Sequence, residues 1–166
     1  MTALKLIAMA AALAGVAGTV PAQARVSVDH APSATLASGS TYAWAPVPAV
    51  GYGTIDPEIA NPITAERLRR LTETTLTSRG YRQVGDLGEA DLLVSYTIIL
   101  VPEDGDSYRL EARHQMRGTL VLDLTERETG RLVWRATSDK RVTGKDASEK
   151  KLTALLREMT KSLPQR

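Results

Sequence analysis

Residues 118–142 read GTLVLDLTERETGRLVWRATSDKRV, and this stretch decides the fold. Its first part alternates between two sets of side chains. One set is Leu120, Leu122 and Leu124, and the other is Thr119, Val121 and Asp123. Strict alternation of this kind predicts a β-strand over Gly118–Thr125 that buries one face and exposes the other.

A short loop is expected to connect this strand to a second one. Gly130 can adopt the left-handed conformation, so residues 127–130 predict a type I turn within a three-residue hairpin loop. In such a loop Arg127 faces Arg131, and the second strand runs over Leu132–Val142. The length of the loop then sets which residues of the two strands lie opposite each other.

The register of this hairpin follows from the loop. Leu124 is expected to face Trp134 on the buried side, and Asp123 is expected to face Arg135 on the exposed side. The hairpin therefore predicts one apolar pair in the core and one ion pair on the surface.

Three further strands with clear alternation are expected earlier in the chain, and residues 81–84 and 108–116 are weaker strand candidates. Residues 91–101 alternate over their whole length, and Thr41–Ala45 places Tyr42 and Trp44 on one face. Residues 26–29 form a shorter alternating segment. The fully apolar side of the 91–101 strand consists of Leu92, Val94, Tyr96, Ile98 and Leu100. This strand is therefore predicted to be central in a sheet that helices cover on one face.

Two amphipathic helices complete the pattern. The first is expected to begin with Asn61 and Pro62 and to end at Gly80, and the second is expected over Ala147–Leu163. Their apolar stripes are Ala65, Leu68, Leu71 and Leu76 in the first, and Leu152, Leu155, Leu156, Met159 and Leu163 in the second. We therefore expect an α+β fold, a two-layer sandwich with both helices on one face of a mostly antiparallel sheet.

The N-terminal residues are typical of a secretory signal. Lys5 supplies a positive charge, residues 6–20 are apolar, and Pro21–Ala24 ends in an Ala-x-Ala pattern. We expect cleavage after Ala24, a single mature domain over 25–166, and a location in the periplasm or outside the cell. An uncleaved membrane anchor would need about 20 apolar residues. Residues 6–20 are shorter than that, so we expect the segment to be cleaved and the mature chain to have no membrane span.

Composition excludes several classes of protein. The 166 residues include 21 Lys and Arg, 19 Asp and Glu, and no Cys. The missing Cys excludes thiol chemistry, disulfides and a lipid anchor attached through an N-terminal Cys. The near balance of charge, without a long basic run, lacks the electrostatic footprint of nucleic-acid binding.

No residue pattern indicates catalysis or a bound metal. His30 and His114 lack the spacing of a zinc motif. Residues 103–107 hold three carboxylates but not the remaining ligands of a calcium loop. Ser95 lies inside a strand, without the sharp turn that exposes a nucleophile. We therefore expect no catalytic residue, no metal, no cofactor and no enzymatic activity.

Several strings of the sequence resemble the domain of unknown function 4136 family. They are Thr41–Trp44, Arg79–Tyr96, Gly118–Leu124, Thr129–Arg135 and the final helix up to Pro164. The resemblance covers residues from about 40 to 164 and implies an exported protein of the bacterial envelope. Many members are predicted lipoproteins, but this chain has no Cys after its apolar run. We therefore expect a form without a lipid anchor.

We interpret the chain as a non-catalytic binding or scaffolding module of the bacterial cell envelope, with an envelope protein as its partner. The predicted interaction surface is the polar face of the sheet that the helices leave uncovered. Its candidate residues are Thr97, Thr119, Asp123, Arg135 and Thr137.

Two alternatives stay open. A small-molecule carrier would use Tyr42 and Trp44 together with Tyr52 in the Gly- and Pro-rich loop over residues 46–62. That function requires a pocket lined by Tyr42 and Trp44. A hydrolytic enzyme is the third hypothesis, and it requires titratable groups that converge in one cleft.

Overall fold

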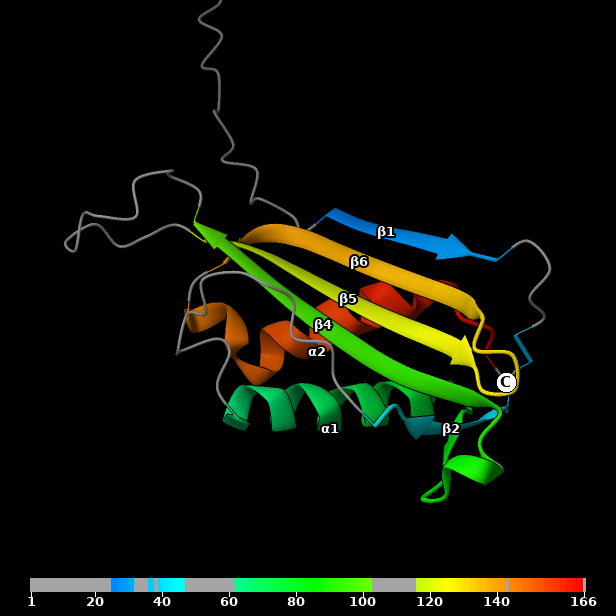
Figure 1. Ribbon diagram of the computed structural model, residues 1–166. Helices are drawn as coiled ribbons and strands as arrows, with labels where there is room; N and C mark the ends of the chain where they lie inside the picture. Colours follow the sequence, from blue (N-terminus) through cyan, green and yellow to red (C-terminus); the bar gives the residue numbers. More distant parts are fainter. Residues whose placement is uncertain are drawn as a thin grey trace, which may run out of the picture.

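The structure, a computed structural model, describes residues 25–31, 36–37, 39–46, 62–102, 116–142 and 144–165 (Figure 1). The strands in these ranges are β1 Arg25–His30, β2 Thr41–Trp44, β3 Arg82–Gln83, β4 Leu92–Pro102, β5 Met116–Glu126 and β6 Leu132–Val142. The α-helices are α1 Pro62–Ser78 and α2 Glu149–Met159. Short 3₁₀ turns occupy Leu87–Glu89, Gly144–Ala147 and Thr160–Ser162.

All six strands belong to one sheet, in the order β1-β6-β5-β4-β2-β3. The pairs β1–β6, β6–β5 and β5–β4 are antiparallel, whereas β2 runs parallel to both β4 and β3. Both helices lie on the same side of the sheet (Figure 1). The chain is therefore a two-layer α+β sandwich with a mostly antiparallel sheet, as the alternation and the two apolar stripes predicted.

The core lies between the helices and one face of the sheet. Leu122, Leu124 and Trp134 from the sheet and Leu156 and Met159 from α2 are each at most 1% exposed. α1 contributes Leu68, Leu71 and Leu76 to the same cluster. Burial of each such side chain contributes roughly 1.5–3 kcal/mol, so the leucine stripes position both helices.

The hairpin between β5 and β6 has the predicted pairs but not the predicted loop. Leu124 faces Trp134 and Asp123 faces Arg135, as expected. Arg127 does not face Arg131, because the backbone N–H of Glu126 donates to Arg131 O at 2.8 Å and the loop has four residues. A bulge at Leu124/Thr125 then shifts the register and restores the predicted pairs.

The helix ends agree with the prediction only in part, and α2 ends at Met159 and not at Leu163, because the 3₁₀ turn Thr160–Ser162 follows it. α1 is followed by Gly80 with a φ of +92°, the left-handed conformation that the sequence predicted. The second helix begins at Glu149 and not at Ala147, since Ser148 is extended and gives no side-chain cap. Asp146, just before these residues, pairs with Lys140 at 2.8 Å and with Lys151 at 3.0 Å.

A carboxylate ties β2 to the start of β4. Asp91 Oδ2 accepts hydrogen bonds from the Thr41 N–H at 2.7 Å and from the Thr41 hydroxyl at 2.8 Å. The Asp91 N–H donates to Thr41 Oγ1 at 3.0 Å in return. The bonds that Thr41 donates stabilise the charged carboxylate and lower the pKa of Asp91.

We expect Asp91→Asn to lower the free energy of unfolding by about 1–2 kcal/mol at neutral pH, because one acceptor of charge-assisted bonds is lost. The lowered pKa means that Asp91 stabilises the fold above its unfolded pKa and that this contribution disappears as pH falls through the folded pKa. Urea unfolding between pH 7 and pH 2 should therefore show the two proteins converging at the acid end.

The matched control for this prediction is Glu66→Gln, which removes an exposed carboxylate of α1, away from Asp91. Its unfolding curve should follow that of the natural protein at every pH. An Asp91→Asn deficit that stays constant down to pH 2 would contradict the role given to the charged carboxylate.

Candidate functional site

The side of the sheet that faces away from the helices is the candidate site, and we call it the outer face. Side chains alternate along a strand and partners in a register share a face, so the pairing defines its members. Three rows cross four strands: Asp29, Arg135, Asp123 and Ser95; Ser27, Thr137, Val121 and Thr97; and Arg25, Asp139, Thr119 and Ile99. Beyond the third row, β4, β5 and β6 add Val101, Arg117 and Arg141.

The first row alternates in charge. Arg135 donates from Nε to Asp123 Oδ1 and from its second terminal nitrogen to Asp123 Oδ2, both at 2.7 Å. These bonds raise the pKa of Arg135, and the nearby Asp29 charge adds to the effect. A two-point Arg–carboxylate contact of this kind fixes the guanidinium plane, so the row presents a rigid pattern of charge.

The second row holds two threonines, and the third row holds one threonine beside the charged residues Arg25 and Asp139. Thr97 lies opposite Val121, and Val121 lies opposite Thr137. Thr119 lies opposite Asp139 in the next row. The structure therefore places all five predicted surface residues on one face, in three neighbouring rows.

Five charged residues of this face were not predicted from the sequence: Arg25, Asp29, Arg117, Asp139 and Arg141. Arg25 and Asp29 reach it because β1 pairs with β6, and Asp139 faces Arg25 from β6. Arg117 donates to Asp139 Oδ2 at 3.0 Å. Oδ1 of Asp139 is buried and has no hydrogen-bond partner among the described residues. The alternation of Arg25, Ser27 and Asp29 indicates a strand, but the sequence does not show which strand it pairs with.

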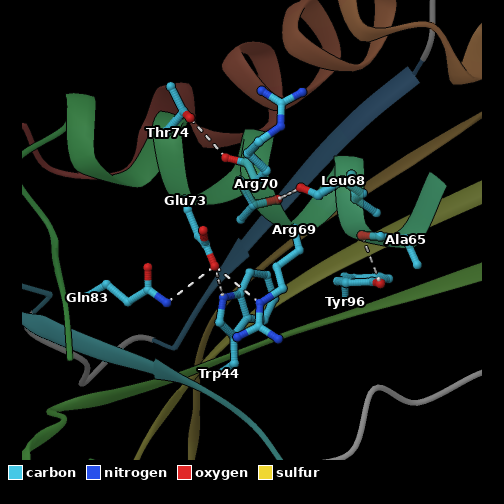
Figure 2. Close-up of polar contacts among 10 residues, drawn as sticks. Trp44, Ala65, Leu68, Arg69, Arg70, Glu73, Thr74, Gln83 and Tyr96 are labelled. Atoms are coloured by element: carbon cyan, nitrogen blue, oxygen red, sulfur yellow. Dashed lines mark hydrogen bonds and ion pairs between the residues drawn. The ribbon is translucent and has the colours of Figure 1, made fainter. Parts of the chain in front are cut away.

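Trp44 of β2 lies on the other side of the sheet, against α1 (Figure 2). Trp44 donates from its indole nitrogen to Glu73 Oε1 at 2.7 Å. Arg69 and Gln83 donate to the same oxygen at 3.2 and 3.3 Å. The Arg69 guanidinium also lies over the Trp44 ring, 5.2 Å from its centroid. These contacts hold Trp44 as a structural link between the sheet and α1.

Tyr42 belongs to the core. Its side chain is 1% exposed, and burial, helped by the charge of Glu73, raises the pKa of Tyr42 to about 12. Tyr52 and residues 47–61 lie outside the described residues. Of the three aromatic residues proposed for a carrier, Tyr42 and Trp44 therefore pack on the helix side of the sheet, and Tyr52 is not described by the structure.

A cavity of about 70 Å³ lies between the helices and the sheet. Neither Tyr42 nor Trp44 lines it. Its lining includes Leu68, Ile98, Leu100, Leu120, Leu152 and Leu155, with Lys140 and Asp146 also present. The pocket that the carrier hypothesis requires is therefore not formed by these two aromatic residues.

The remaining candidates for chemistry stay apart. His30 is exposed at the end of β1, and Ser95 lies on the outer face opposite Asp123. His114 and residues 103–107 lie outside the described residues. Within the described ranges, no group of three or more His, Cys, Asp or Glu could hold a metal ion. Neither helix of the described part is long and apolar enough to cross a membrane.

The comparisons with known proteins point to one family. The model described as Domain of unknown function (DUF4136) matches residues 26–165, which includes β1 as well as the predicted region. No curated protein matches the chain at a significant level.

Solved structures share the fold. The PelC dodecamer from Paraburkholderia phytofirmans has a TM-score of 0.57 at 16% identity, over 87% of this chain and 99% of that one. A DUF4136 family protein from Bacteroides thetaiotaomicron has a TM-score of 0.53 at 15% identity, over 84% and 95% of the two chains. A PDZ domain protein from Parabacteroides distasonis has a TM-score of 0.56 at 12% identity, over 82% of this chain and 34% of that one. At these identities the likeness establishes the fold alone.

Proposed function

This chain belongs to the DUF4136 family, and we propose that it is an exported protein of the bacterial cell envelope that acts by binding another protein through the outer face. The observation that supports this role is the arrangement of the layers. Both helices cover one side of the sheet, and no described helix covers the other (Figure 1). The described part of the chain thus leaves one face of a six-stranded sheet without a helix, which suits a protein partner better than a small ligand.

The chemistry of the outer face favours a protein over other partners. Acidic and basic side chains alternate in the row of Asp29, Arg135 and Asp123, next to threonine and valine. A nucleic acid or an anionic membrane would require a surplus of basic residues on one surface. Mixed charge with short β-branched side chains instead provides complementarity and partner selection between proteins.

The structural neighbours support a scaffolding role. One chain of this fold is described as a dodecamer, so the fold is compatible with a multi-subunit assembly. For the present chain we expect the same capacity to hold a partner.

Site-specific cross-linking tests the proposal. The natural chain has no Cys, so Thr137→Cys gives one attachment point for a photo-crosslinker in the centre of the outer face. Arg157→Cys places the same probe on the exposed side of α2 and is the matched control. We expect the Thr137→Cys variant to capture a distinct envelope protein in cells and the Arg157→Cys variant to capture much less of it.

Adding Arg135→Glu to the Thr137→Cys variant should abolish the captured product, because the charge row is reversed next to the probe. Equal capture from both faces, or no captured protein from the outer face, would contradict the proposed role. The intact mass of the chain purified from the same cells tests export. We expect a chain that begins at Arg25, and a mass that retains residues 1–24 would contradict export by cleavage.

A further inference from the structure

β1 forms one edge of the sheet, and in the described part of the chain no strand pairs with its outer side. The N–H of Ala31 donates to Val133 O at 3.2 Å, so Ala31 points its backbone groups toward β6. In an antiparallel pair the backbone groups alternate in direction. Arg25, Ser27 and Asp29 therefore bond to β6, whereas Val26, Val28 and His30 direct their N–H and C=O groups away from the sheet.

We propose that this edge binds the β1 edge of a second copy of the chain, antiparallel, with Ser27 on the two-fold axis. The two sheets then join into one continuous sheet with all helices on the same side. This goes beyond the proposed function, because it adds a partner and a second contact region that the outer face does not need.

The sequence of β1 is complementary to itself only in this register. With Ser27 opposite Ser27 of the second copy, Arg25 faces Asp29 of the second copy, and Asp29 faces Arg25 of the second copy. Both pairs lie in positions without backbone bonds between them, where side chains approach most closely. Moving the partner by two residues in either direction keeps the faces aligned but replaces the opposite-charge pairs by pairs that involve Ser or Ala.

Both faces of the joined sheet fit this arrangement. On the outer face, Arg25 of the second copy extends the row of Asp29, Arg135 and Asp123, so that charges alternate across the boundary. On the helix side, Val26 and Val28 are partly buried against the core and meet the same residues of the second copy. The joined edge also satisfies the backbone groups of Val26 and Val28.

Sedimentation of the mature chain over residues 25–166 tests the proposal. A single edge contact buries little area, so we expect a monomer–dimer equilibrium between about 10 µM and 1 mM that weakens as salt rises. Arg25→Glu and Asp29→Arg each convert both ion pairs into like-charge pairs. Each variant alone should dimerise roughly tenfold more weakly or worse.

An equimolar mixture of the two variants provides the decisive measurement. Glu at position 25 of one chain then faces Arg at position 29 of the other, and the natural Asp29 faces the natural Arg25. The mixture should recover dimers of natural affinity that contain one chain of each kind. Arg82→Glu, which changes a charge by the same amount at the opposite edge of the sheet on β3, should leave dimerisation unchanged.

Val28→Pro separates strand pairing from a contact made by charges alone. It removes an N–H that points away from β6, so thermal unfolding should show a folded chain while the dimer is lost. Two results would overturn the proposal. One is a natural chain that stays monomeric or forms a larger ring at these concentrations, and the other is a pair of charge variants that do not recover dimers when mixed.

Discussion

Trp134→Ala is expected to lower the free energy of unfolding by about 3–5 kcal/mol, a larger loss than we expect from any other single substitution. Trp134 is 1% exposed and lies opposite Leu124 on the buried face of the sheet. Its indole N–H also donates to the Ser162 hydroxyl at 3.2 Å, beyond the end of α2. Removing the ring leaves a cavity where β6 meets the C-terminal segment and deprives Ser162 of a donor.

Thermal and urea unfolding measure this loss. For a domain of this size the midpoint temperature should fall by roughly 10 °C. Leu132→Ala is the control in the same strand, because Leu132 is 37% exposed, and it should change the free energy of unfolding by less than about 1 kcal/mol. Similar losses for the two variants would contradict the division of β6 into a buried and an exposed face.

The register around Trp134 shows what alternation can predict. Both strands bury one face, so Leu122, Leu124 and Trp134 must all point inward, and this requirement excludes any register that is shifted by one residue. The loop itself depends on turn geometry that Gly130 only partly determines. An error of one residue in the loop was therefore cancelled by the bulge, which keeps Trp134 in the core.

Helix α1 shows where apolar patterning misses part of the core. Three threonines are buried next to the leucines, although the predicted apolar stripe contains no threonine. They are Thr64, Thr72 and Thr75. Thr72 donates to Leu68 O at 2.8 Å, and Thr75 donates to Leu71 O at 2.7 Å. A hydroxyl that bonds within its own helix carries little cost of burial, so its side chain can face the core.

The outer face could be predicted only in part, for a topological reason. Asp123 and Arg135 belong to one hairpin, and their contact follows from local register. Asp29 joins them because the first strand pairs with the last one, a contact that spans most of the chain. Nothing in the alternation of β1 specifies its neighbour. The charge row and the self-complementary edge thus became visible only with the strand order.

Gly118→Ala is the second large effect that we expect, with a loss of about 1–3 kcal/mol in the free energy of unfolding. Gly118 lies on β5 opposite Lys140, with its missing side chain directed toward the helix layer. A Cβ at this position would stand 2.8 Å from both Cγ1 and Cγ2 of Val142. Val142 is branched at Cβ and cannot rotate both methyl groups away, so the strand itself must move.

A double-mutant cycle identifies the contact as the cause. Val142→Ala removes both methyl groups, so Gly118→Ala should cost little in that background, and the coupling energy should exceed about 1 kcal/mol. Gly85→Ala is the control, because a Cβ there meets nothing within 4 Å and the effect should be neutral or slightly stabilising. If the losses of Gly118→Ala and Val142→Ala simply add, steric overlap with Val142 is not the reason for glycine at this position. The backbone conformation does not explain glycine at this position either, because Gly118 has no left-handed φ.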